Sequence, residues 1–140
     1  MPYAIRAAGN RQKGIGLMSL NIKMRETAEA VILDLSGRLT LGEPLAELRD
    51  SVREALVGDR KNILLNLAEV SYIDSSGLGQ LIGSYATATS RGGQMKLLNL
   101  QKRVNDLMQV TKLLTVFETY TSEEAALRSF AAGKATHANL

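Results

Sequence analysis

A serine pair at the start of a predicted helix carries the chemistry of this sequence. The segment 72–79 reads Tyr-Ile-Asp-Ser-Ser-Gly-Leu-Gly, and it lies between a strand-like apolar run and a helical pattern. In open parallel sheets, functional groups collect at the carboxyl ends of strands. The hydroxyls of Ser75 and Ser76 would lie beside unpaired backbone N–H groups, a position that favours phosphate. Gly77 and Gly79 remove side-chain bulk, so the surface of another protein can approach the backbone there.

Three simpler or different interpretations of this segment compete with a binding function. Asp and Ser are preferred N-cap residues, so an Asp-Ser-Ser start to a helix needs no function beyond capping. Serine catalysis lacks a base, because the one histidine, His137, is near the C-terminus and no spacing supports Lys96 or Lys112. The Gly-x-Ser-x-Gly motif of serine hydrolases and the Gly-Lys-Ser/Thr signature of a phosphate-binding loop are both missing.

Composition narrows the class of protein further. The chain has 140 residues, which fits one domain with a working core. The absence of cysteine excludes disulfides and thiolate sites, and a single histidine leaves little room for a metal site, so we expect no metal. The longest uncharged run, 75–90, is too short and too polar to span a bilayer. We therefore expect a cytoplasmic protein without membrane insertion.

The excess positive charge is confined to the N-terminus. Residues 1–20 carry a net charge of +3, whereas residues 21–140 have equal numbers of basic and acidic side chains. Because aromatic residues are only 4% and the domain is neutral, we expect no direct nucleic-acid binding. Residues 1–18 show no sustained period and are predicted to form a flexible basic extension, with Met18 as an alternative start. Residues 133–140 are predicted to form a flexible C-terminal tail.

Strand and helix patterns alternate between the two predicted tails. Four segments have helical periodicity, and the second carries Leu78, Leu81, Ile82 and Tyr85 as its inward stripe. Five segments are strand-like: 20–25, 30–35, 63–67, 95–98 and 116–120. The short link between the first two predicts a hairpin. The order predicts an α/β fold with a mixed, mostly parallel five-stranded sheet, an N-terminal hairpin and about four covering helices.

The beginning of the first predicted helix has its own signals. Thr40 and Glu43 have the spacing of a capping box, in which each side chain caps a backbone N–H of the helix. Pro44 suits the first turn of that helix. These residues are therefore predicted to fix where the helix begins.

The motif and its flanking segments resemble one known family. Asp74 to Gly79 matches the Asp-Ser-Ser/Thr-Gly-Leu-Gly phosphorylation motif of the STAS domain, the family of bacterial anti-sigma factor antagonists. The central strand and its approach to the motif, the second strand and the turn after the second helix are also similar, at residues 62–67, 70–73, 35–39 and 92–95. The resemblance extends from about Leu20 to Ala132 and implies a STAS domain at 19–132 with a STAS-like fold.

The resemblance implies a function by partner switching. Ser75 would be the phosphoacceptor, with its neighbour Ser76 as the less favoured alternative. The unphosphorylated domain would bind an anti-sigma factor, often a serine kinase of GHKL type, and so release a sigma factor. The kinase would phosphorylate Ser75 to end the association, and a PP2C-type phosphatase would reverse it. ATP and magnesium would belong to the kinase, so this chain would be neither an enzyme nor a cofactor binder.

The expected partner-binding surface has two parts. One is the motif itself: Asp74, Ser75, Ser76, Gly77, Leu78 and Gly79. The other is Thr40 and Glu43, since the resemblance places the loop before the first helix near the partner. An alternative is a STAS-type structural or regulatory subunit of a lipid-transport or other membrane-associated complex, although the intact Asp-Ser-Ser-Gly motif argues against a purely structural role. The sequence leaves the oligomeric state open.

Overall fold

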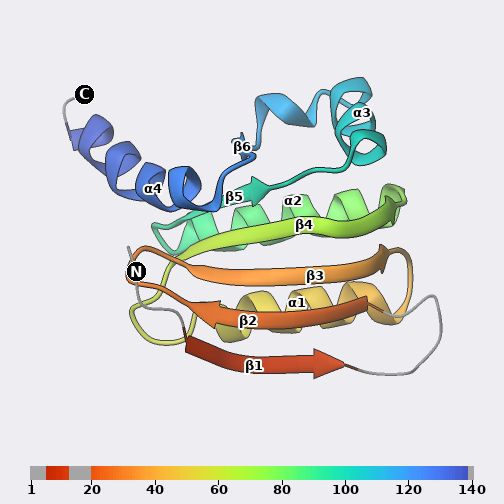
Figure 1. The fold of residues 1–140 in the computed structure, drawn as a ribbon, viewed down its shortest axis with the longest axis horizontal. Coiled ribbons are helices and arrows are strands. Elements are labelled where there is room, and N and C mark those ends of the chain that lie inside the picture. Colours follow the sequence, from red (N-terminus) through yellow and green to blue (C-terminus); the bar gives the residue numbers. More distant parts are fainter. Residues whose placement is uncertain (1–5, 13–19, 139–140) are drawn as a thin grey trace.

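The computed structural model describes residues 6–12 and 20–138, which form one six-stranded sheet with helices on both faces (Figure 1). The strands lie side by side in chain order: β1 (Arg6–Gln12), β2 (Leu20–Glu26), β3 (Val31–Leu39), β4 (Asn62–Ile73), β5 (Gln94–Leu98) and β6 (Thr119–Tyr120). β2 pairs antiparallel with both β1 and β3, and the remaining pairs are parallel. The predicted mixed sheet with its hairpin is confirmed, with β2 to β6 as the five expected strands.

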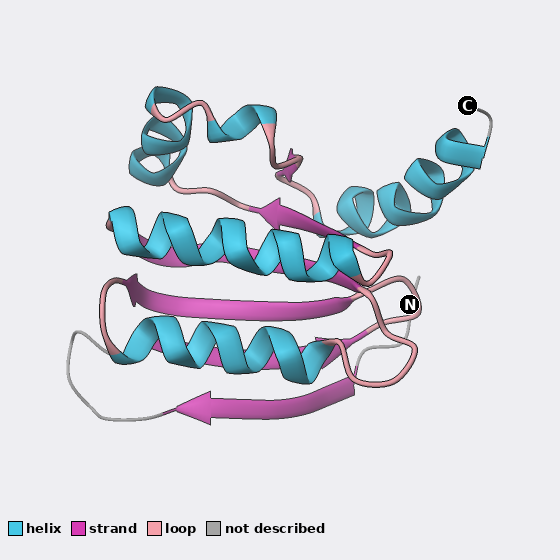
Figure 2. Cartoon of the chain, turned by 180° about the vertical axis from the view of Figure 1, so that it is seen from behind, coloured by secondary structure: helices cyan, strands magenta, loops and turns pink. Residues whose placement is uncertain are grey.

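Four helices cover the sheet, as predicted. They are α1 (Glu43–Ala55), α2 (Ser75–Ser90), α3 (Lys102–Val110) and α4 (Glu123–Ala138), with a short 3-10 turn at Leu113–Thr115. Figure 2 shows α1 and α2 side by side on one face of the sheet. No helix in the described part of the chain is both long and apolar enough to cross a membrane.

The two faces of the central strands bury different clusters. Leu33 and Leu65 belong to the main core, which also contains the inward side chains of α1 and α2. Ile32 and Leu64, which alternate with them, pack with Phe130 of α4 in a second, smaller cluster. Both central strands are therefore covered on both faces, which explains their almost continuous apolar sequences.

The first strand corrects the prediction of a flexible extension over residues 1–18. β1 pairs with β2 from Arg6 opposite Glu26 to Gln12 opposite Asn21, with a register shift near Gly9. Without β1, β2 would be a sheet edge with a row of unpaired backbone groups. Pairing of this kind uses backbone hydrogen bonds and needs no apolar period, which is why the sequence pattern did not reveal it. The other residues of that extension lie outside the described residues.

The predicted tail over 133–140 is also wrong for most of its length, because α4 continues to Ala138. Six alanines between Glu123 and Ala138 favour this continuation, since alanine has the highest helix propensity. Gly133 costs about 1 kcal/mol in a helix interior, which is too little to end it. Residues 139–140 lie outside the described residues.

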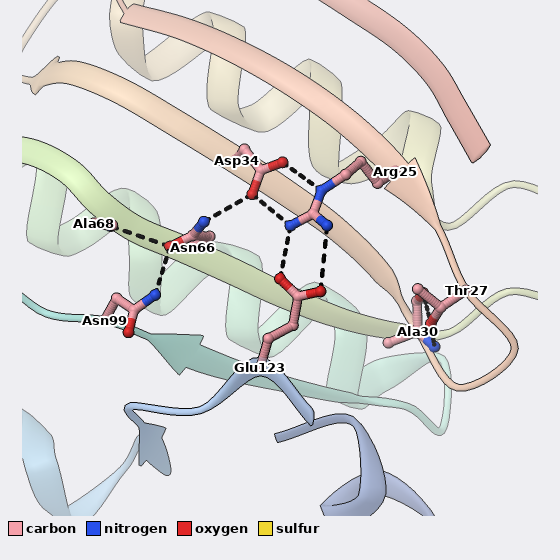
Figure 3. Close-up of polar contacts among 8 residues, drawn as sticks. All are labelled: Arg25, Thr27, Ala30, Asp34, Asn66, Ala68, Asn99 and Glu123. Carbon is pink, nitrogen blue, oxygen red and sulfur yellow. Dashed lines mark hydrogen bonds and ion pairs between the residues drawn. The ribbon is translucent and has the colours of Figure 1, made fainter. Parts of the chain in front are cut away.

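A cluster of charged and amide side chains fastens α4 to the sheet (Figure 3). Arg25 of β2 donates to both carboxylate oxygens of Asp34, at 2.6 and 2.9 Å, and to both oxygens of Glu123, at 3.2 and 2.9 Å. Asn66 of β4 donates to Asp34 at 2.8 Å. Two carboxylates raise the pKa of the Arg25 guanidinium above its already high value. This cluster joins four elements, β2, β3, β4 and α4, and the pair between Arg25 and Glu123 spans 98 residues of the sequence.

Candidate functional site

The predicted chemical segment lies where β4 ends and α2 begins. The exposed Ser75 is the first residue of α2, and the half-buried Ser76 follows it. β3 runs parallel to β4 and ends at the same edge, where Leu39 pairs with Ile73. The loops that lead into α1 and α2 therefore leave the sheet side by side (Figure 2).

Asp74 connects these two loops. It is the N-cap of α2, and its Oδ1 accepts a hydrogen bond from the Gly77 N–H at 2.8 Å. Its Oδ2 accepts a second bond from the Leu41 N–H at 3.0 Å, across 33 residues of chain. The two backbone donors favour the ionised carboxylate and so lower the pKa of Asp74. The bond from Leu41 has the larger effect and the bond from Gly77 the next. The capping interpretation of Asp74 is thus confirmed, and the Leu41 bond adds a tertiary contact that the sequence did not indicate.

Gly77 serves the packing of this junction. It is buried, and a Cβ at this position would overlap the carbonyl oxygen of Leu39 and lie 2.8 Å from Cγ2 of Ile73. The lack of a side chain at Gly77 therefore allows α2 to approach the end of β3, and does not open the backbone to a partner as expected. Gly79 is exposed with no atom within 4 Å of its added Cβ, so its backbone remains accessible.

The loop before α1 differs from the predicted capping box. Gly42, at φ +110°, is the N-cap, and no side chain caps the helix there. Glu43 is the first helical residue, two positions too early for its capping-box role opposite Thr40. The Leu41 bond to Asp74 and the positive φ of Gly42 hold this stretch outside the helix. The structure nevertheless brings the loop against Asp74, so both parts of the expected surface are neighbours.

One face of α2 continues the exposed surface away from Ser75. Gly79, Ile82, Gly83 and Ala86 follow it on the solvent side at helical spacing. Ile82 was predicted to face inward, but 42% of its surface is exposed, because Leu78, Leu81 and Ala88 occupy the inward side. Leu41, in the loop bonded to Asp74, is 74% exposed. We call Ser75, Gly79, Ile82, Gly83, Ala86 and Leu41 together the Ser75 face.

A cavity of about 530 Å³ opens beside Ser75, between the start of α2 and α3. Its walls come from the end of β4, from α2 and from α3: Tyr72, Ile73, Asp74, Ser75, Leu78, Arg103, Val104, Leu107 and Thr111. The guanidinium of Arg38 lies 4.8 Å from the centre of the Tyr72 ring and stacks over it. Sequence reasoning missed Arg103 because only the packing of α3 near the end of β4 brings it to this site.

Lys96, one of the two lysines considered as a catalytic base, is engaged elsewhere. Its side chain is 3% exposed, and its Nζ donates to Ser129 Oγ at 2.9 Å and pairs with Glu118 at 3.2 Å. Ser129 belongs to α4, which packs on one face of the sheet, whereas α2, which begins at Ser75, packs on the opposite face. Lys96 therefore does not serve as a base for Ser75.

Comparison with known proteins gives consistent results. A family model described as STAS domain matches residues 21–126. The anti-sigma F factor antagonist of Paenibacillus polymyxa is 30% identical over 111 residues, which cover 79% of this chain and 94% of that protein. A putative anti-sigma factor antagonist from Thermotoga maritima is structurally similar, with a TM-score of 0.72 and 22% identity over 79% of this chain and 94% of that one. A Bacillus cell fate determinant solved in its phosphorylated form has a TM-score of 0.57 and 21% identity, over 86% and 98% of the two chains.

Proposed function

The chain belongs to the STAS domain family, and we propose that it is an anti-sigma factor antagonist switched by phosphorylation of Ser75. The observation that carries the proposal is the position of Ser75. It is exposed on the first turn of α2, directly after the capping Asp74, within the six-residue motif from Asp74 to Gly79. The name of the Paenibacillus relative supports the class of partner, an anti-sigma factor.

In this proposal the unphosphorylated Ser75 face binds an anti-sigma factor that is also a serine kinase of GHKL type. Binding releases a sigma factor and so changes transcription. From this function we expect a cytoplasmic location. The exposed apolar side chains of Leu41 and Ile82 supply contact area around Ser75, and Gly79 allows a close approach. Ser76 on the first turn of α2, Thr40 in the neighbouring loop and Glu43 at the start of α1 add further contacts. Gly77 and Leu78 are buried and contribute by holding the first turn of α2 in place.

Phosphorylation would end binding through charge. The kinase supplies ATP and magnesium, so this chain acts as a binding module and substrate and not as an enzyme. A phosphate adds about −1.5 to −2 charges, which the N-terminus of α2 tolerates. At an interface the same charge must lose its water beside the ionised Asp74. A cost of about 3 kcal/mol would weaken binding roughly a hundredfold, and a PP2C-type phosphatase would restore it.

The proposal is tested with a cognate kinase and two substitutions. Incubation with kinase and ATP, followed by mass mapping, should place one phosphate on Ser75, and Ser75→Ala should abolish the labelling. Ser76→Ala is the matched control and should leave labelling intact. Labelling of Ser76 in the Ser75→Ala variant would overturn the assignment of the acceptor.

Charge is separated from side-chain size by two further variants. Ser75→Asp should weaken binding to the kinase, while Ser75→Asn, similar in size but neutral, should bind more tightly than the Asp variant. Titration calorimetry measures both affinities, and thermal unfolding should show melting temperatures close to that of the wild type. Equal binding of the two variants would show that charge is not the switch.

A further inference from the structure

The side chain of Arg103 makes no polar contact with the described side chains of the fold. It is exposed, and among the described side chains, those of residues 20–131, no hydrogen bond or ion pair engages it. Its neighbour Lys102 differs, because the Lys102 Nζ pairs with Asp106 at 2.8 Å on the same helix. Arg103 is thus a free cation on the wall of the cavity that Ser75 also lines.

The Asp74 carboxylate, which also lines this cavity, does not pair with Arg103. Asp74 lines the same wall as Ser75, but both of its oxygens accept backbone N–H groups, from Gly77 and Leu41. These bonds fix the direction of the carboxylate toward the backbone of the two loops. The remaining walls are largely apolar, with Ile73, Leu78 and Val104 among their side chains. An anion that enters from Ser75 would therefore meet Arg103 as its cationic partner.

We propose that Arg103 is the intramolecular counter-ion of a phosphate carried by Ser75, which it holds in the cavity between α2 and α3. This inference rests on the proposed function, since it concerns the phosphorylated form of the same serine. An arginine guanidinium binds phosphate oxygens in a bidentate manner, and Arg103 lines the same cavity as Ser75. Apolar walls strengthen the attraction relative to open solvent. Phosphorylation would then also tie α3 to the start of α2.

The test uses full-length protein with phosphoserine placed at position 75 during synthesis, so that no kinase is needed. A phosphorus NMR titration measures the second pKa of the phosphate in the unmodified background and in Arg103→Gln. A nearby cation favours the dianion, so removing it should raise that pKa by about 0.5–1 unit. Arg103→Lys, which keeps the charge, should recover most of the difference. Lys102→Gln is the matched control and should change the pKa by less than about 0.2 unit, because Lys102 does not line the cavity and its exposed charge is screened by solvent.

The outcomes separate this inference from the proposed function. An Arg103→Gln variant with an unchanged phosphate pKa, or a shift equal to that of Lys102→Gln, would overturn the pairing. Failure of a kinase to modify Ser75 would refute the proposed function but would leave the NMR result untouched. Arg103→Gln without phosphate should melt within a few degrees of the unmodified protein, since no hydrogen bond or ion pair among the described side chains engages Arg103.

Discussion

Replacing Asp74 tests whether one carboxylate holds the ends of β3 and β4 together. In Asp74→Asn the amide oxygen can still cap the Gly77 N–H, because Asn is also a good N-cap residue. The amide nitrogen cannot accept from Leu41, so one bond to a charged group is lost. Such bonds contribute about 1.5–3 kcal/mol, and the exposure of this one reduces the loss to about 1–2 kcal/mol. Asp74→Ala also loses the cap, for a total of about 2–4 kcal/mol.

The pH dependence of this loss identifies the carboxylate as its source. The pKa of Asp74 is lowered below its ordinary 3.8 in the folded protein. A lowered pKa means that the ionised group stabilises the fold fully above the unfolded pKa, and that this contribution disappears as the pH falls through the folded pKa. The difference in unfolding free energy between wild type and Asp74→Asn should be constant from about pH 5 to 8. It should shrink as the pH falls below about 4.

Urea unfolding at a series of pH values measures these differences. Asp106→Asn is the control, since Asp106 lies in an exposed pair with Lys102 and should change the unfolding free energy by less than about 0.5 kcal/mol. Two results would refute the reasoning. One is a wild-type advantage over Asp74→Asn that persists unchanged at pH 3, and the other is equal stability of the Asn and Ala variants at pH 7.

Four further changes test other parts of the structure. Gly77→Ala should lower the unfolding free energy in urea by about 1–3 kcal/mol, because its Cβ overlaps the β3 backbone. Gly79→Ala, on the open side of α2, should not lower it. Glu123→Gln should cost about 1 kcal/mol and speed hydrogen exchange in α4, because it weakens the pair with Arg25. Deletion of residues 1–12 should speed exchange at the β2 amides that pair with β1, and unchanged exchange would argue against that pairing.

The elements that position the site were predictable because their signals are local. The apolar run of β4, the Asp-Ser-Ser start and the inward stripe of α2 all lie within 30 consecutive residues. Asp74 is a preferred capping residue, and the structure shows it as the cap. The one misplaced member of the stripe, Ile82, lies next to Leu81 on the helix, where the apolar side meets solvent. Periodicity identifies a helical face but does not fix the edge of that face.

The features that the sequence did not predict depend on contacts between distant segments. β1 forms through backbone pairing with β2, which does not require alternating apolar and polar residues, so the sequence pattern did not reveal it. The bond between Asp74 and the Leu41 N–H depends on where β3 ends relative to β4, and it displaces the expected capping box at Thr40. Arg103 becomes part of the site only when α3 packs near the end of β4. No spacing in the sequence encodes these distances.

At the start of α2, the residues that stabilise the fold and the proposed phosphoacceptor are different, although they are adjacent in sequence. Asp74 and Gly77 make the contacts that hold α2 against the loop before α1. The hydroxyl of Ser75, between them in sequence, makes no hydrogen bond within the described residues and faces solvent. A phosphate added to that hydroxyl therefore breaks no hydrogen bond of the fold. Its charge instead changes the affinity of the Ser75 face for a partner. Because Ser75 holds no contact of the fold, a change of almost two charge units at this position can alter partner binding while the domain stays folded.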